Sequence, residues 1–189
     1  MFRDFEELLE SLNAARVRYL IGGAHALALH ARPRATKDLD LFIDPSKANA
    51  ARFIVALRAF FGTEPPSYVT ESALLDPEVI IQLGVAPVRV DVLSAFATIT
   101  FRQAWAARQD AAFGSVPAHY LGREHLIREK LHFDRPQDRA DVAALRAVPD
   151  RPIPLLARRS TNAGSRKVTQ TKAARIRRKP GKRKPTGRC

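Results

Sequence analysis

The sequence has almost no cysteine: the only one among its 189 residues is Cys189. An intrachain disulfide is therefore excluded, and so is a zinc site built from cysteine thiolates. No apolar run approaches the roughly 20 residues that a membrane-spanning helix needs. The acidic start, residues 1–7, lacks the apolar core of a secretory signal peptide. We therefore expect a cytoplasmic protein that makes no membrane contact.

Acidic residues are absent from the end of the chain. Residues 158–189 contain 13 Lys and Arg and no Asp or Glu, whereas residues 1–157 contain 19 of each charge, so the whole net charge of +13 lies in this tail. The tail has few apolar residues and no aromatic residue on which a base could stack. We expect one domain over residues 1–148, followed by a Pro-containing linker and disordered Lys/Arg-rich tail over residues 149–189. The tail either binds nucleic acid phosphate without sequence specificity or is only a solubilising extension.

Hydrophobic periodicity predicts an α/β (α+β) domain. A short mixed β-sheet is expected, with helices packed on it and a helical pair at its C-terminal end. Residues 63–78 are rich in turn residues, and we assign no element there. The expected helices cover residues 5–15, 24–31, 44–60, 100–109, 123–133 and 137–147, and the expected strands cover residues 17–21, 38–43, 79–83, 88–93 and 116–121.

Two aspartates alternate with leucines in the predicted strand over residues 38–43. Asp38 and Asp40 therefore point to one face of the strand, with Cα atoms roughly 6.6 Å apart. Two carboxylates this close repel each other unless a cation lies nearby, and Mg²⁺ is the ion that carboxylates and phosphates commonly share. The simpler alternative is a solvated strand edge. Taken alone, the pair favours that alternative.

A second alternating strand, over residues 88–93, places Arg89 and Asp91 on one face and valines on the other. Residues 84–87 form a connection of hairpin length from the strand before it. If this strand lies beside Asp38 and Asp40, Asp91 completes a trio of carboxylates. Three carboxylates can bind two divalent ions that clamp the attacking and leaving oxygens of an in-line displacement.

The segment before the aspartates carries features that suit a phosphate ligand. Gly22 and Gly23 follow a short strand and open a helix, where free N–H groups can bind phosphate and a ligand can approach the backbone. Arg34, Thr36 and Lys37 lie in the basic loop that follows, and Arg34 is the best placed of these to contact a triphosphate. The alternative for this loop is a solvated surface with local charge balance.

These residues together resemble the nucleotidyltransferase fold of the DNA polymerase β superfamily. Residues 30–40 read H-x-x-x-R-x-T-x-D-x-D after the glycine pair, and residues 130–141 read K-x-x-x-x-R-x-x-D-x-x-D. This order of motifs is similar to that of bacterial stand-alone nucleotidyltransferases of the AbiEii toxin type. The similarity covers about residues 14–148. This sequence departs from the family pattern at Ala31, where relatives often have glycine, and in the exact position of the glycine pair.

The resemblance implies a Mg²⁺-dependent transfer of a nucleoside monophosphate from an NTP to a hydroxyl of RNA, such as tRNA, or of a protein. Two Mg²⁺ ions are implied, with Mn²⁺ as a substitute, and a toxin of this type would have an antitoxin partner. The catalytic residues implied are Asp38, Asp40, Asp91 and Lys130, of which the three aspartates would bind metal; Gly22, Gly23, Arg34, Thr36 and Lys37 would bind the nucleotide.

Two alternatives stay open. Lys130 can instead be an exposed helix residue, and Asp138 and Asp141 can be first-turn acids of a helix, with Arg135 as an ion-pair partner. The whole chain can also be a catalytically inactive module of this fold that binds nucleic acid through its tail. No other potential metal ligand accompanies His25 and His30 in the sequence, so packing or capping roles are expected for both.

Overall fold

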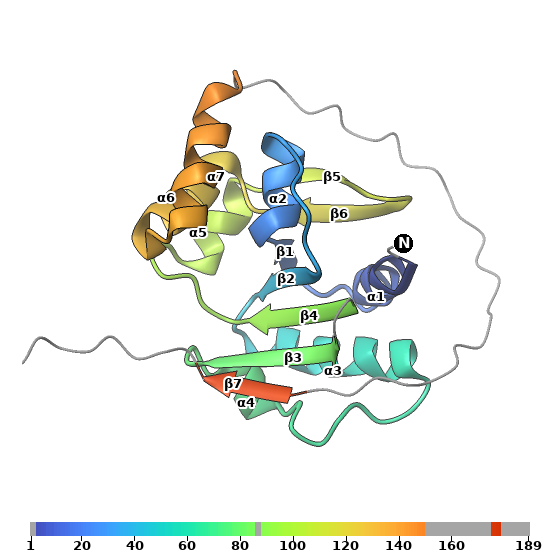
Figure 1. Cartoon of the computed structure of the whole chain (residues 1–189). Coiled ribbons are helices and arrows are strands. Elements are labelled where there is room, and N and C mark those ends of the chain that lie inside the picture. The colour runs from blue at the N-terminus through green and yellow to red at the C-terminus, as the bar shows by residue number, and fades with distance from the viewer. Residues whose placement is uncertain (1–2, 86–87, 150–174, 179–189) are drawn as a thin grey trace, which may run out of the picture.

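The computed structural model describes residues 3–85, 88–149 and 175–178, and one mixed β-sheet organises them (Figure 1). The strand order is β5-β6-β1-β2-β4-β3-β7. Strands β2 and β4 are parallel neighbours near the middle of this order. The strands are β1 (Tyr19–Ile21), β2 (Asp38–Ile43), β3 (Val79–Val85), β4 (Val88–Leu93), β5 (Gln109–Phe113), β6 (Val116–Tyr120) and β7 (Arg175–Arg178).

Helices lie on both sides of the sheet. Helices α1 and α3 pack together, and α4 contacts α3 and β3, whereas α2, α6 and α7 contact one another and α2 lies against β2 (Figure 1). Among the residues that the structure describes, no helix is long and apolar enough to cross a membrane. The helices are α1 (Arg3–Ala14), α2 (Gly23–His30), α3 (Lys47–Phe61), α4 (Glu71–Leu75), α5 (Phe101–Ala106), α6 (Arg123–Phe133) and α7 (Pro136–Ala147).

The alternation in β2 divides the sheet into a core face and a polar face. Leu39, Leu41 and Ile43 are fully buried, while Asp38 and Asp40, which alternate with the leucines, keep partial contact with solvent. Because side chains alternate along a strand, the leucines anchor β2 and so fix which way the aspartates point. Burying the leucines therefore holds both carboxylates on the opposite face.

The expected α/β fold is confirmed, and several element boundaries follow from local chemistry. Helix α3 begins after Ser46, whose side chain accepts the Asn49 N–H at 3.3 Å, and ends at Gly62, whose φ of 69° is the left-handed C-cap conformation. Helix α5 begins with a capping box between Thr100 and Gln103.

Sequence periodicity missed two elements. The turn-rich stretch contains the short helix α4, which Thr70 caps by accepting the Ala73 N–H at 3.1 Å. The helix expected over residues 100–109 ends at Ala106, and β5 follows as one arm of an antiparallel hairpin with β6. A strand without clear alternation is stabilised by its cross-strand partner, which a local pattern does not reveal.

The tail differs from expectation in the four residues that the structure describes. Arg175–Arg178 form β7, which pairs antiparallel with β3, although the composition of this segment predicts disorder. Strand β3 would otherwise end the sheet with unpaired backbone groups, and these groups provide partners for an added strand. The rest of the expected linker and tail beyond residue 149 lies outside the described residues.

Buried Asn49 joins three elements beneath the sheet. Its side-chain oxygen accepts the Arg18 N–H at 2.8 Å, and its amide donates to the carbonyls of Arg18 (3.0 Å) and Asp44 (3.1 Å). The Arg18 guanidinium also pairs with the Asp44 carboxylate at 2.8 Å. Asn49 thus links the entry to β1, the exit of β2 and the first turn of α3.

We predict that Asn49→Ala lowers the free energy of unfolding by about 2–3 kcal/mol, because it leaves buried backbone groups without partners. Urea unfolding followed by circular dichroism measures the loss. Asn49→Asp is the matched variant: it keeps the acceptor for the Arg18 N–H but sets a buried carboxylate oxygen against the carbonyls of Arg18 and Asp44, so it should be no more stable than Asn49→Ala. Equal stability of wild type and Asn49→Ala would contradict the joining role.

Candidate functional site

The three sequence-predicted carboxylates lie on one face of two neighbouring strands. In the parallel pairing of β2 with β4, Asp40 is opposite Asp91 and Asp38 is opposite Arg89. Residues directly opposite each other on paired strands share a face, so all four side chains lie on the polar face of the sheet. Asp91 therefore faces the same side as Asp38 and Asp40.

Arg89 lies between two of these carboxylates. Its Nη2 is 2.5 Å from Asp38 Oδ2 and 3.4 Å from Asp91 Oδ2, and its Nε is 3.1 Å from Asp91 Oδ1. Asp38 and Asp91 are diagonal neighbours on the two strands, a separation of roughly 7–8 Å between Cα atoms that a guanidinium can span. The two-residue spacing between Arg89 and Asp91 places both on one face, but no local pattern gives Arg89 a role at the carboxylates.

A second residue that sequence reasoning missed is Gln82 on β3. It is opposite Asp91 in the β3–β4 pairing, is buried, and donates from Nε2 to Asp91 Oδ1 at 3.0 Å. The Asp91 carboxylate is thus fixed by one amide and one guanidinium. The sequence does mark Gln82, because it is the single polar residue in the apolar strand predicted over residues 79–83.

Gly23 brings the start of α2 directly against Asp40. A Cβ built on Gly23 would lie 1.7 Å from Asp40 Oδ2, and the φ of Gly23 is +52°. No side chain fits in this space, and the backbone conformation itself favours glycine. The neighbouring Gly22 N–H donates to the Asp40 carbonyl at 2.9 Å, which joins the glycine turn to β2.

The surroundings of Asp40 disfavour its charged form. Burial, together with the nearby charges of Asp91 and Asp38, raises its pKa from the ordinary 3.8 to about 6, and Lys130 and Arg89 oppose that rise. The folded protein therefore binds more protons than the unfolded chain between about pH 4 and pH 6. Stability is lost as pH rises through that window, because folding then holds a carboxylate where its charge is disfavoured.

We predict that Asp40→Asn stabilises the metal-free protein at pH 7.5. The rise of the Asp40 pKa from 3.8 to about 6 sets an upper bound of about 3 kcal/mol, and the partial exposure of Asp40 reduces the expected gain to about 1–2 kcal/mol. Urea unfolding in EDTA from pH 4 to pH 8 should show the gain at pH 7.5 and its disappearance near pH 4. Glu10→Gln, at an exposed carboxylate of α1 outside the site, serves as the control. A gain that does not change with pH would contradict this account.

Lys130 belongs to a buried ion network at the C-terminal helical pair. Its Nζ is 2.5 Å from Asp141 Oδ2 and 3.3 Å from Asp138 Oδ1, and the side chains of both aspartates are only 3% exposed. Arg135 also contacts Asp138, at 2.5 Å. Lys130 is therefore not the exposed helix residue that the simpler alternative described. Its charge acts on Asp40, so this network borders the carboxylates of the sheet.

The pKa values of the two partner aspartates reflect this network. Burial by itself would raise the pKa of Asp141, but hydrogen bonds from Lys130 and Gln137 lower it below its usual range. Burial would also raise the pKa of Asp138, but Arg135 and Lys130 outweigh it and lower that pKa. Both aspartates are therefore held as carboxylates.

Substituting Lys130 tests whether the network is structural. Lys130→Met keeps the side-chain length but leaves two buried carboxylates with fewer cations, so we predict a loss of about 3 kcal/mol in unfolding free energy. Lys47→Met, at an exposed lysine of α3, should change stability by less than about 0.5 kcal/mol. Denaturant unfolding of both variants at pH 7 measures the difference, and equal stability would contradict a buried structural pair.

The residues of the basic loop occupy different environments. Arg34 pairs with Asp141, with Nε 3.2 Å from Oδ1, so this cation is joined to the Lys130 network. The Thr36 hydroxyl donates to the Asp38 carbonyl at 3.2 Å and accepts the Asp38 N–H at 3.4 Å. Lys37 is exposed, and its carbonyl accepts the Arg89 N–H at 3.5 Å. Of the three, Arg34 is joined to the ion network and Thr36 shapes the entry to β2.

The region is further fixed by Glu129 of α6, which the sequence analysis did not single out. This buried carboxylate accepts the N–H groups of Ala97 and Thr98, each at 2.8 Å, and also the Thr98 hydroxyl. The loop that follows β4 is thereby attached to α6. His30 contacts the Leu121 carbonyl at 2.9 Å, and His25 packs between Phe5 and Phe113, in line with the packing roles expected for them.

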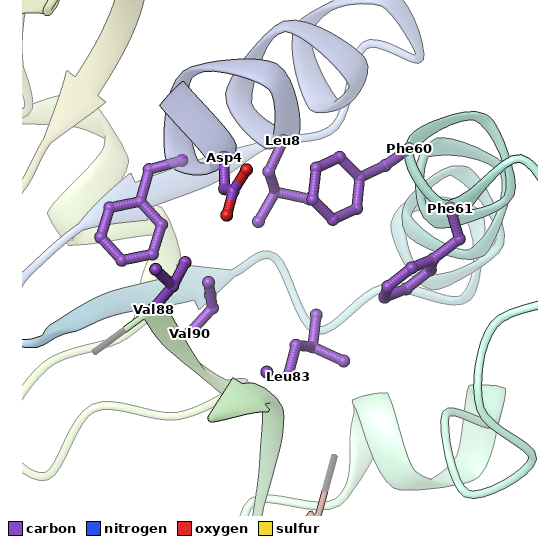
Figure 2. A pocket seen from close by; sticks show the side chains of 9 residues that line it. Asp4, Leu8, Phe60, Phe61, Leu83, Val88 and Val90 are labelled. Carbon is purple, nitrogen blue, oxygen red and sulfur yellow. The ribbon is translucent and has the colours of Figure 1, made fainter. Parts of the chain in front are cut away.

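An apolar cavity lies on the opposite face of the sheet from the carboxylates. Its walls come from α1, α3 and the paired ends of β3 and β4, and Figure 2 shows Leu8, Phe60, Leu83 and Val90 around it. Val90 and Leu83 alternate with Asp91 and Gln82, so they point away from the polar face. Asp4 supplies the one carboxylate of the lining. The cavity is a packing space under the sheet and adds nothing to the candidate site.

The donor chemistry of the polar face suits a hard divalent cation. Asp38, Asp40 and Asp91 supply carboxylate oxygens, which Mg²⁺ prefers, and the repulsion among them is what a cation would relieve. Within residues 3–85, 88–149 and 175–178, however, no group of three or more His, Cys, Asp and Glu residues is placed to hold one ion. This differs from the expected convergence of all three carboxylates, because Arg89 lies between Asp38 and Asp91.

Comparison with known proteins gives fold-level similarities only. No protein-family model matches the chain, and no curated protein matches it. A Thermotoga maritima protein, TM1012, described as a candidate nucleotidyltransferase, is 13% identical with a TM-score of 0.48, covering 75% of this chain and 89% of its own.

Two structures of the antibiotic-resistance factor ANT(2'')-Ia are also similar. The solution structure is 14% identical with a TM-score of 0.48, covering 76% of this chain and 80% of its own. The crystal structure in complex with adenylyl-2''-tobramycin is 12% identical with a TM-score of 0.47, covering 77% and 87%. At these identities and TM-scores, the similarities assign neither a family nor an acceptor to this chain.

Proposed function

We propose that the chain is a Mg²⁺-dependent nucleotidyltransferase that moves a nucleoside monophosphate from an NTP to a hydroxyl of RNA, such as tRNA, or of a protein. The observation that carries the proposal is the register of β2 and β4, which sets Asp40 opposite Asp91 with Asp38 on the same face. Carboxylates at this spacing repel each other without a cation, and phosphoryl transfer is a chemistry in which carboxylates, a divalent ion and phosphate oxygens meet.

Each residue of the site has a role in that reaction. The acceptor oxygen attacks the α-phosphorus of the NTP, the bond to the bridging oxygen breaks, and pyrophosphate leaves. Asp91 receives the hydroxyl proton, while the start of α2 at Gly22 and Gly23 offers backbone N–H groups to the phosphates. Asp40, with Asp38 and Asp91 beside it on the same face, would hold Mg²⁺, which would supply charge neutralisation at the reacting phosphate, and Mn²⁺ would substitute for it.

The cations of the neighbouring network complete the proposal. Lys130 contacts both Asp138 and Asp141, and Arg34 contacts Asp141, so each cation is held by a carboxylate, and the charge of Lys130 also acts on Asp40. Such fixed positive groups stabilise charge that develops on a transferring phosphate without rearranging during the reaction. Lys130 acts here mainly by positioning, and Arg34 is the nucleotide contact.

The AbiEii-type motif order extends the proposal from the reaction to a biological role. By this resemblance, the chain is the toxin of a toxin–antitoxin pair in the cytoplasm, and its basic tail holds nucleic acid without sequence specificity. Growth arrest on expression, relieved by the product of an adjacent gene, would support that role. Fold resemblance does not fix the acceptor, which has to be found by experiment.

We predict that the full chain, given labelled NTPs, Mg²⁺ and total RNA, releases pyrophosphate and labels an acceptor. Asp38→Asn and Asp40→Asn should each reduce the rate by at least about 100-fold, since even outer-shell partners of metal sites matter by about 10–100-fold. Asp110→Asn, the matched strand aspartate, should retain wild-type activity. Omitting RNA and adding protein extract separates the two acceptor classes.

Two results would overturn the proposal. Tail-dependent RNA binding with no transfer, for any nucleotide or acceptor tried, would favour the inactive binding module. Activity that survives in both aspartate variants would place the chemistry elsewhere in the chain.

A further inference from the structure

The position of Arg89 bears on how many metal ions the site can hold. Its guanidinium contacts Asp38 and Asp91 at 2.5–3.4 Å, in the space that an ion bridging those two carboxylates would need. Its side chain is 30% exposed, as is that of Asp38 at 31%, so the pair is formed at the open side of the site. A fixed positive group therefore already fills one of the two places where cations would lie.

The remaining contacts of Asp91 point in the same direction. Asp91 Oδ1 accepts a hydrogen bond from the Gln82 amide at 3.0 Å and has the Arg89 Nε 3.1 Å away as an ion-pair neighbour, while its Oδ2 accepts from the Arg89 Nη2 at 3.4 Å. Both oxygens of Asp91 therefore lie against the guanidinium, and a metal ion bound to either one would meet its positive charge. Asp40 differs, because its carboxylate faces the backbone at Gly23 rather than the Arg89 guanidinium.

Charge also favours a single ion. The three carboxylates carry three negative charges and Arg89 carries one positive charge, so two negative charges remain on this face of the sheet. One divalent ion neutralises them, whereas two would leave an excess of positive charge before any nucleotide binds.

Building on the proposed function, we propose that Arg89 takes the place of one of the two divalent ions, so that the nucleotide-free site binds a single Mg²⁺ or Mn²⁺ centred on Asp40. Arg89 is a positioning residue: it neutralises Asp38 and Asp91 and keeps them apart. This replaces the expectation of two ions with one ion and one guanidinium.

Counting bound ions tests this inference without measuring activity. Metal-free full-length chain is titrated with Mn²⁺, and free Mn²⁺ is followed by electron paramagnetic resonance. Wild type should bind one ion. Arg89→Gln and Arg89→Ala should bind two, the second with a Kd within about tenfold of the first, since both variants restore the space and charge of a second site. Arg89→Lys keeps the charge and should bind one.

Matched controls separate a local effect from a general loss of charge. Arg58→Gln breaks an exposed arginine pair with Glu64 and should still bind one ion. The melting temperature gives a second readout: metal-free Arg89→Gln should melt below wild type, because Asp38 and Asp91 lose their shared cation, and Mn²⁺ should raise its melting temperature more than that of wild type.

The inference is overturned if wild type binds two ions or none, or if Arg89→Gln and Arg89→Ala bind the same number as wild type. Its failure is distinguishable from that of the proposed function. A wild type that transfers nucleotide and binds two ions refutes only the role of Arg89. One that binds one ion and transfers nothing refutes only the enzymatic proposal.

Discussion

Repulsion among three carboxylates on two adjacent strands is the constraint on which the rest of this structure depends. Asp40 lies opposite Asp91, with Asp38 two residues away, and the pairing of β2 with β4 places these charges on one face, where positive charge lowers the cost. Arg89 supplies it from within the sheet, and Lys130 supplies it from α6. The C-terminal helical pair is thus part of the electrostatics of the sheet as well as of its packing.

The polar face stays in place because the opposite face is apolar and closely packed. Leu39, Leu41 and Ile43 allow β2 only one orientation, and Asn49 fixes its exit by hydrogen bonds to backbone carbonyls. A shift of one residue in β2 would expose the leucines and bury the aspartates, which would cost both hydrophobic burial and charge solvation. The energetics of the core therefore determine the geometry of the site.

How far the sequence predicts this molecule depends on the range of the interactions involved. Alternation in β2 and β4 predicts the shared face of the carboxylates, and the capping residues Ser46 and Gly62 account for where α3 begins and ends. The guanidinium between Asp38 and Asp91 depends on the parallel register of strands 51 residues apart, which no local pattern encodes. Glu129 is similar, because its partners lie in a loop that only the tertiary fold brings to α6.

Because Gly23 lies so close to Asp40, substitutions at positions 23 and 40 should be correlated in evolution. A larger residue at 23 would displace the carboxylate at 40, and a different residue at 40 would remove the reason for a glycine with left-handed backbone geometry at 23. Chains of common descent should therefore keep or lose these two residues together. A relative that has lost the glycine but kept the aspartate would show that its helix enters the sheet at a different angle.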